Sequence, residues 1–133
     1  MYAKQDIAVV SVTGLESSSY IDKVAPGGPT TATSPSSALS IIARTDRVYT
    51  PAGGPSAPII VSEGGEKKYT VIRDNMNEVV VWNPWEDGVK VIGDFEPKEG
   101  YKEMICVEAG AVKGWQKLEA GETWEGGQVL LAH

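Results

Sequence analysis

The chain has 133 residues, of which 41% are hydrophobic and 23% charged, and its formal net charge is −6. This size and composition are typical of one globular domain with its own core. A nonspecific grip on nucleic acid or on an anionic membrane surface needs clustered lysines and arginines, and the longest basic run is Lys67-Lys68. No apolar run approaches the roughly 20 residues of a membrane-spanning helix. We therefore expect neither nucleic acid nor a membrane as a partner.

Strand signals follow one another along the whole chain. β-Branched and aromatic residues dominate these stretches, and turn residues bound them. Gly64-Gly65 predicts the turn of a hairpin. Two continuous apolar runs, NEVVVWNPW and EMICVEAG, are typical of strands buried on both faces. In chain order, the predicted strand regions are 6–14, 38–50 (one strand, with room for a second), the hairpin 57–74, then 77–85, 103–110 and 122–132.

The remaining segments predict loops rather than helices. EPKEGYKEM (96–104) is the best helical candidate, and it predicts a single turn. APGGPTTATSPSSA (25–38) is low in complexity and predicts a mobile loop, and TPAGGPSAP (50–58) predicts a connection between strands. Neither segment separates halves of different composition. We therefore predict one all-β domain over residues 1–133, an antiparallel β-sandwich or a barrel.

The single cysteine, Cys106, cannot form an intramolecular disulfide, which favours a reducing compartment. The first ten residues lack the basic start and the cleavage site of a secretory signal. These two observations predict a cytoplasmic protein. The apolar neighbours Ile105 and Val107 predict that the Cys106 thiol is buried and inert.

Glu108 stands inside the apolar run of residues 103–110, where a carboxylate is unexpected. Two interpretations stay open on the residues alone. Desolvation raises a carboxyl pKa and can tune the group for general acid or base catalysis near neutral pH. A glutamate at a strand end, paired or half solvated, explains the same pattern without chemistry.

Two further pairs of residues also have both a functional and a structural interpretation. Asp46-Arg47 is either part of a binding site or a surface ion pair at a strand end. Trp82 and Asn83 suit a sugar site, since a tryptophan face stacks on C–H groups and an amide binds hydroxyls, but a core tryptophan before an Asn-Pro turn explains them as well. The only histidine, His133, is the last residue and is expected to be solvated.

No set of residues has the spacing of a metal site, a phosphate-binding loop or a Ser/His/Asp triad. We therefore predict no metal and no cofactor.

Five stretches, taken together, resemble one family: VTGLESSSYIDKV, TDRVYTPAGGP, VVVWNPWEDGVKVIGDF, EMICVEAGAV and KLEAGETWEGGQVL. Their order and spacing are similar to those of hexose-6-phosphate mutarotases, the glucose-6-phosphate 1-epimerase branch of the aldose 1-epimerase-like proteins, and the fungal members look closest. The resemblance covers the C-terminal half of the family's sequences. It implies part of their large β-sandwich, the galactose mutarotase-like supersandwich.

The resemblance also implies a reaction. Family members exchange the α and β anomers of a hexose 6-phosphate. A carboxylate takes the proton of the anomeric hydroxyl, a histidine protonates the ring oxygen, and the opened sugar recloses on its other face. Glu108 matches the catalytic base, and Asp46 matches an acidic residue that holds sugar hydroxyls. Trp82 and Asn83 lie in matching positions beside the pocket, and Arg47, next to Asp46, completes the expected set of substrate-binding residues.

The family's acid histidine belongs to a His-Thr-Tyr motif that falls just before Met1. The resemblance thus assigns the base and one wall of the site to this chain, without the acid. Because a positioned proton donor is worth about 10²–10⁴-fold in rate, we expect weak epimerase activity or none from the chain alone.

Other interpretations remain open: a non-catalytic carbohydrate-binding or protein-interaction β-sandwich, or a fragment of a longer gene product. Half of a large sandwich leaves sheet surface uncovered, so we also expect self-association into a homo-oligomer.

Overall fold

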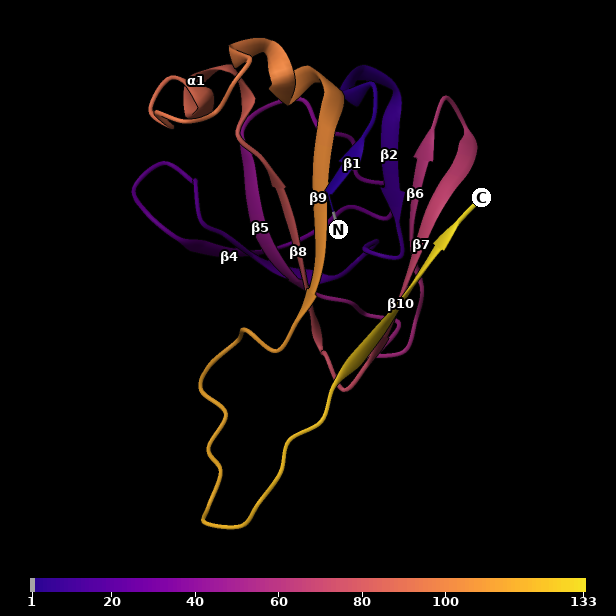
Figure 1. The fold of residues 1–133 in the computed structure, drawn as a ribbon, viewed down its shortest axis with the longest axis vertical. Helices are drawn as coiled ribbons and strands as arrows, with labels where there is room; N and C mark the ends of the chain where they lie inside the picture. The colour runs from indigo at the N-terminus through magenta and orange to yellow at the C-terminus, as the bar shows by residue number, and fades with distance from the viewer. Residues whose placement is uncertain (1) are drawn as a thin grey trace.

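Two antiparallel β-sheets pack face to face in the computed structural model, which describes residues 2–133 (Figure 1). The six-stranded sheet has the order β1-β9-β8-β5-β3-β4, and the four-stranded sheet has the order β10-β7-β6-β2. The predicted antiparallel β-sandwich is therefore confirmed. The strands are β1 Tyr2–Lys4, β2 Val10–Thr13, β3 Ser19–Asp22, β4 Thr30–Thr33, β5 Thr45–Thr50, β6 Ile59–Glu63, β7 Glu66–Asp74, β8 Glu78–Asn83, β9 Met104–Gly110 and β10 Gly127–Ala132.

The core lies between the sheets and is built from alternate residues of each strand. Val79 and Val81 of β8 and Ile105 and Val107 of β9 are fully buried there. The residues between them are half-buried or exposed on the outer face, the face of the six-stranded sheet that points away from the four-stranded sheet. The prediction that both strands are buried on both faces was therefore wrong. In an antiparallel sandwich, only one face of each sheet needs to meet the other sheet.

The segment 25–38, predicted to be a loop, contains strand β4, which pairs with β3 as an edge strand. Its β-branched threonines favour that pairing despite the low complexity of the segment. The region 6–14 is only half strand, because it begins with the 3₁₀ turn η1, Ile7–Val9. The hairpin turn at Gly64-Gly65 is confirmed, and both glycines have positive φ angles.

Helical structure is confined to short turns among residues 2–133. The predicted turn in 96–104 is confirmed as the 3₁₀ helix η2, Lys98–Glu103. The α-helix α1, Trp85–Val89, was not predicted, since five residues are too few to show a helical period. No helix in this described part of the chain is long and apolar enough to cross a membrane.

A buried arginine joins the loops at one end of the sandwich. Arg73 of β7 is 2% exposed. Its guanidinium group donates hydrogen bonds to backbone carbonyls in the connection 51–58 and in the turn between β7 and β8. The four acceptors belong to Gly54, Ala57, Met76 and Asn77. These bonds hold the predicted connection against the sheet that carries β7.

Candidate active site

Three neighbouring strands bring Glu108, Trp82 and Asp46 to the outer face of the six-stranded sheet. Cys106 of β9 is paired with Trp82 of β8, which is paired in turn with Asp46 of β5. Glu108 lies two residues beyond Cys106, opposite Val80, so it shares their face of the sheet. Strand spacings of about 4.8 Å and a two-residue offset of about 6.8 Å place the Cα atoms of Asp46 and Glu108 roughly 12 Å apart.

Asp46 is held in place from strand β3. The carboxylate oxygen Oδ1 of Asp46 lies 3.3 Å from Nζ of Lys23. The Lys23 amide also donates to the Asp46 carbonyl at 2.9 Å, which extends the β3–β5 ladder by one residue. The Asp46 side chain is 23% exposed and the Lys23 side chain 51%. The carboxylate is therefore oriented by its partner and still open to a ligand.

Lys23 was not among the predicted site residues. It directly follows Asp22, the last residue of β3, and strand alternation alone would have assigned these two residues to opposite faces. What the sequence did not reveal is that β3 lies beside β5, because residues 15–24 were not predicted to form a strand.

Glu108 is exposed, unlike the buried base expected from its apolar neighbours. Among the side chains that the structure describes (residues 5–133), no hydrogen-bond donor or cation pairs with its carboxylate. The apolar neighbours Val107 and Ala109 point to the core, and Glu108, between them, points to the outer face. The run looks apolar in sequence because every second residue faces the core. Glu108 is therefore available to a ligand.

Cys106 lies on the same face and is half-buried, not enclosed in the core as predicted. Burial raises the pKa of its thiol, and the negative charge of Glu108 raises it further. The thiol therefore stays protonated near neutral pH. Its low reactivity stays a prediction, and that prediction now rests on the raised pKa of the thiol in place of a core position.

Asn83 does not reach this face, although it was expected beside the pocket. Its side chain is fully buried, and its amide donates to the carbonyls of Tyr101 and Met104 at 2.8 and 2.9 Å. Its oxygen accepts from the Trp85 amide at 2.8 Å. The asparagine thus connects the end of β8 to η2 and β9. Within the VWNPW stretch, Trp82 points to the outer face, whereas Asn83 has a structural role.

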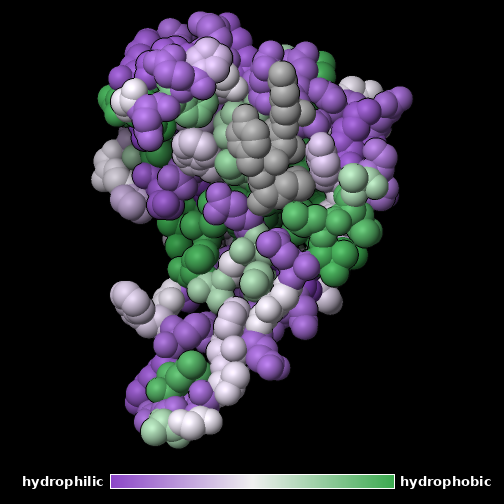
Figure 2. Space-filling model, in the orientation of Figure 1, coloured by the Kyte–Doolittle hydropathy of each residue, from purple (hydrophilic) through white to green (hydrophobic). Residues whose placement is uncertain are grey.

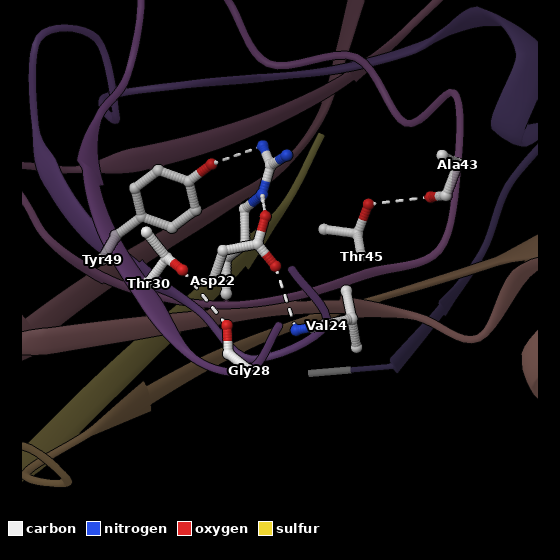
Figure 3. A network of polar contacts seen from close by, with 8 residues as sticks. Asp22, Val24, Gly28, Thr30, Ala43, Thr45 and Tyr49 are labelled. Atoms are coloured by element: carbon white, nitrogen blue, oxygen red, sulfur yellow. Dashed lines mark hydrogen bonds and ion pairs between the residues drawn. The ribbon is translucent and has the colours of Figure 1, made fainter. Parts of the chain in front are cut away.

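Arg47 lies on the opposite face from Asp46, and strand alternation separates these two adjacent residues. Its Nε is 3.2 Å from the Asp22 carboxylate, and its Nη1 is 3.4 Å from the Tyr49 hydroxyl. Figure 3 shows Asp22 and Tyr49 converging on the guanidinium group. The guanidinium also lies 4.8 Å from the centre of the Tyr20 ring. Arg47 and Glu108 therefore lie on opposite sides of the sheet and cannot contact the same ligand group. The structure does not bring Arg47 to the face that carries Glu108 and Asp46.

A cavity of about 250 Å³ adjoins Arg47 and Tyr49 on that inner side, where segment 34–42 covers β5. Burial raises the pKa of the Tyr49 hydroxyl, and this effect outweighs the hydrogen bond from Arg47 and its positive charge, which both lower the pKa. The Arg47 network is thus part of the fold between the layers.

The outer face combines an exposed carboxylate, a half-buried tryptophan and an oriented aspartate, a set that suits the hydroxyls and C–H groups of a sugar. A sequence model of the family described as Aldose 1-epimerase matches residues 3–131. The chain belongs to the aldose 1-epimerase family. The predicted resemblance is thereby confirmed at the level of the family.

Individual relatives agree with this assignment. A candidate glucose-6-phosphate 1-epimerase of Cenchrus ciliaris is 35% identical over 127 residues, which make up 96% of this chain and 37% of that protein. Among solved structures, a candidate mutarotase of Salmonella typhimurium, YeaD, is 33% identical with a TM-score of 0.65, over 81% of this chain and 35% of its own. The protein HI1317, 21% identical with a TM-score of 0.69 over 98% and 43%, supports the fold alone. This aldose 1-epimerase family chain spans less than half the length of the relatives it matches.

Proposed function

We propose that this chain carries the base side of a hexose-6-phosphate mutarotase site, with Glu108 as the general base. The observation that supports it best is the placement of Glu108, Trp82 and Asp46 on one open face of neighbouring strands. The identity to a candidate glucose-6-phosphate 1-epimerase favours a phosphorylated hexose as the substrate class.

In this proposal, the Glu108 carboxylate takes the proton from the anomeric hydroxyl while the ring oxygen gains a proton and its bond to C1 breaks. The open aldehyde then rotates about the C1–C2 bond, and the steps reverse on the other face. Trp82 supports a C–H face of the sugar, and Asp46, oriented by Lys23, accepts hydrogen bonds from hydroxyls.

The proton for the ring oxygen has no histidine source beside Glu108 in this chain. The single histidine, His133, follows β10, and its Nε2 lies 2.8 Å from Oγ1 of Thr70, which belongs to the four-stranded sheet. Water or a group outside these 133 residues must then supply the acid. We expect turnover about 10²–10⁴-fold below that of a site with a positioned acid.

Sugar binding without turnover is the second candidate function. The openness of the face around Glu108 and the distant position of His133 favour it. It differs from the first in one requirement, since a binding site needs no base.

We also propose a cytoplasmic location, because the single cysteine favours a reducing compartment. In addition, we infer that a second chain covers part of the exposed sheet surface.

Magnetisation-transfer NMR on glucose 6-phosphate tests the catalytic proposal by comparing wild type with Glu108→Gln. We expect anomer exchange above the buffer rate in wild type and none in the variant, because the amide cannot accept the proton. Glu86→Gln, the same change at an exposed glutamate of α1 that pairs with Lys90, is the control and should keep the wild-type rate. Exchange that survives Glu108→Gln would refute Glu108 as the base.

A chemical-shift titration with glucose 6-phosphate separates binding from catalysis. Saturable shifts at the Trp82 indole without any exchange would support the binding function in place of the enzymatic one. Absence of both would reject both candidate functions for the isolated chain.

A further inference from the structure

Exposed apolar side chains concentrate on one part of the molecule. Ten large hydrophobic residues are exposed among those that the structure describes. Seven of them lie on β10, on its neighbour β7, or in the loop 111–126 that leads into β10. Figure 1 shows this loop projecting beyond the sheets, and Figure 2 shows hydrophobic surface where β10 crosses the molecule. The seven are Ile72, Val112, Trp115, Leu118, Val129, Leu130 and Leu131.

Strand β10 exposes apolar residues on both of its faces. Val129 is paired with Ile72 and Leu130 with Val71, so Val129 and Leu130 point to opposite sides of the four-stranded sheet. They are nevertheless 52% and 47% exposed, and Leu131 is 42% exposed. Val71 is fully buried, so the sandwich closes over β7 and stops short of β10.

The free edge of β10 differs from the other edges of the two sheets. β1 is three residues long, and β4 is a short threonine-rich strand. The edge of β2 is partly covered, because Val12 exchanges two backbone hydrogen bonds with Leu39. β10 has six residues, and the stretch 126–132 contains no charged residue and no proline. It therefore lacks the features by which proteins usually protect an edge strand.

We propose that β10 is the interface through which two copies of this chain associate, with the two β10 edges paired antiparallel about a two-fold axis. Their four-stranded sheets then form one continuous eight-stranded sheet across the dimer. The apolar residues on both faces of β10 gain cover from the same residues of the partner. This proposal specifies the surface for the self-association inferred under the proposed function, and it does not depend on the epimerase chemistry.

The charge distribution favours a second copy as the occupant. Each chain has a net charge of −6, so two copies repel one another over most of their surfaces. The stretch 126–132 is uncharged, so two copies can meet there without like charges facing each other.

Sedimentation velocity over about a hundredfold range of concentration tests the proposal. We expect wild type to pass from monomer to dimer, and Val129→Lys and Leu131→Lys each to weaken dimerisation by about tenfold or more, because edge lysines oppose strand pairing. Ile42→Lys introduces the same charge at a residue that is 82% exposed outside this region, and it should dimerise like wild type. Circular dichroism and thermal unfolding check that each variant keeps the fold.

The outcomes separate the parts of the proposal. A wild type that stays monomeric throughout would overturn both self-association and the β10 interface. Dimers that tolerate both β10 lysines would overturn the interface alone, as would equal weakening by Ile42→Lys. Hydrogen exchange on wild type gives an independent test: amides of β10 should gain protection with concentration, and unchanged protection in a dimer would contradict the proposal. None of these results bears on anomer exchange, which the Glu108→Gln comparison measures separately.

Discussion

The ammonium group of Lys23 lies 3.3 Å from the carboxylate of Asp46 on the outer face of the six-stranded sheet. One residue along each strand, Asp22 and Arg47 make a second ion pair at 3.2 Å. Because alternate residues of a strand face opposite ways, the two pairs lie on opposite sides of the same β3–β5 ladder. The outer pair is open to a ligand, whereas the inner pair supports the fold.

We predict that the two ion pairs differ in their contributions to stability. Lys23→Ala should lower the free energy of unfolding by less than about 1 kcal/mol, since exposed pairs contribute little. Arg47→Ala should cost about 1–3 kcal/mol, because it also removes the contacts to Tyr49 and Tyr20 and leaves Asp22 without its partner. Urea unfolding of both variants measures the difference. A larger loss for Lys23→Ala would contradict the assignment of the inner pair to the fold.

Asn83→Ala is predicted to destabilise the protein by about 2–4 kcal/mol, because it leaves the Tyr101 and Met104 carbonyls and the Trp85 amide without their partner. Equilibrium unfolding in urea gives the value. Asn77→Ala, at an exposed position before β8, is the matched control and should change stability by no more than about 0.5 kcal/mol. If Asn83→Ala kept wild-type stability and lost only sugar binding, Asn83 would belong to the site after all.

The reactivity of Cys106 should report the charge on Glu108. Burial and the Glu108 carboxylate both raise the pKa of the thiol, because each disfavours the thiolate. In Glu108→Gln the second cause is absent, so the pKa falls, more thiolate is present at a given pH, and alkylation becomes faster. We expect the pH profile of iodoacetamide modification, followed by mass spectrometry, to move to lower pH.

Glu86→Gln serves as the control for the thiol measurement and should leave the profile of Cys106 unchanged. Identical profiles for wild type and Glu108→Gln would mean that the two side chains do not lie together on one face. The measurement requires no turnover, so it tests the geometry of the site even where the chain has no activity.

Particular residues show where sequence reasoning succeeded and where it did not. The hairpin turn at Gly64-Gly65 was predictable because it depends on local backbone preferences. Strand β4 was not, because its pairing with β3 overrides the flexible composition of the segment around it. Of the predicted site residues, the structure brings Trp82 and Asp46 together on one face, whereas their neighbours Asn83 and Arg47 do not lie on that face. Adjacent residues of a strand point to opposite faces, and a short motif does not show which face is open.

By itself, the sequence determined that this is an all-β chain with a glutamate in a strand of apolar residues, and it carried the motifs of its family. These features reside in local patterns of hydrophobicity and turn residues, which act over a few positions. Only the tertiary structure decided that Glu108, Trp82 and Asp46 share an open face, that Lys23 joins them, and that β10 has an uncovered edge. Each of these depends on the register and order of strands that lie far apart in the chain, and that order is set by how the two sheets bury their common core.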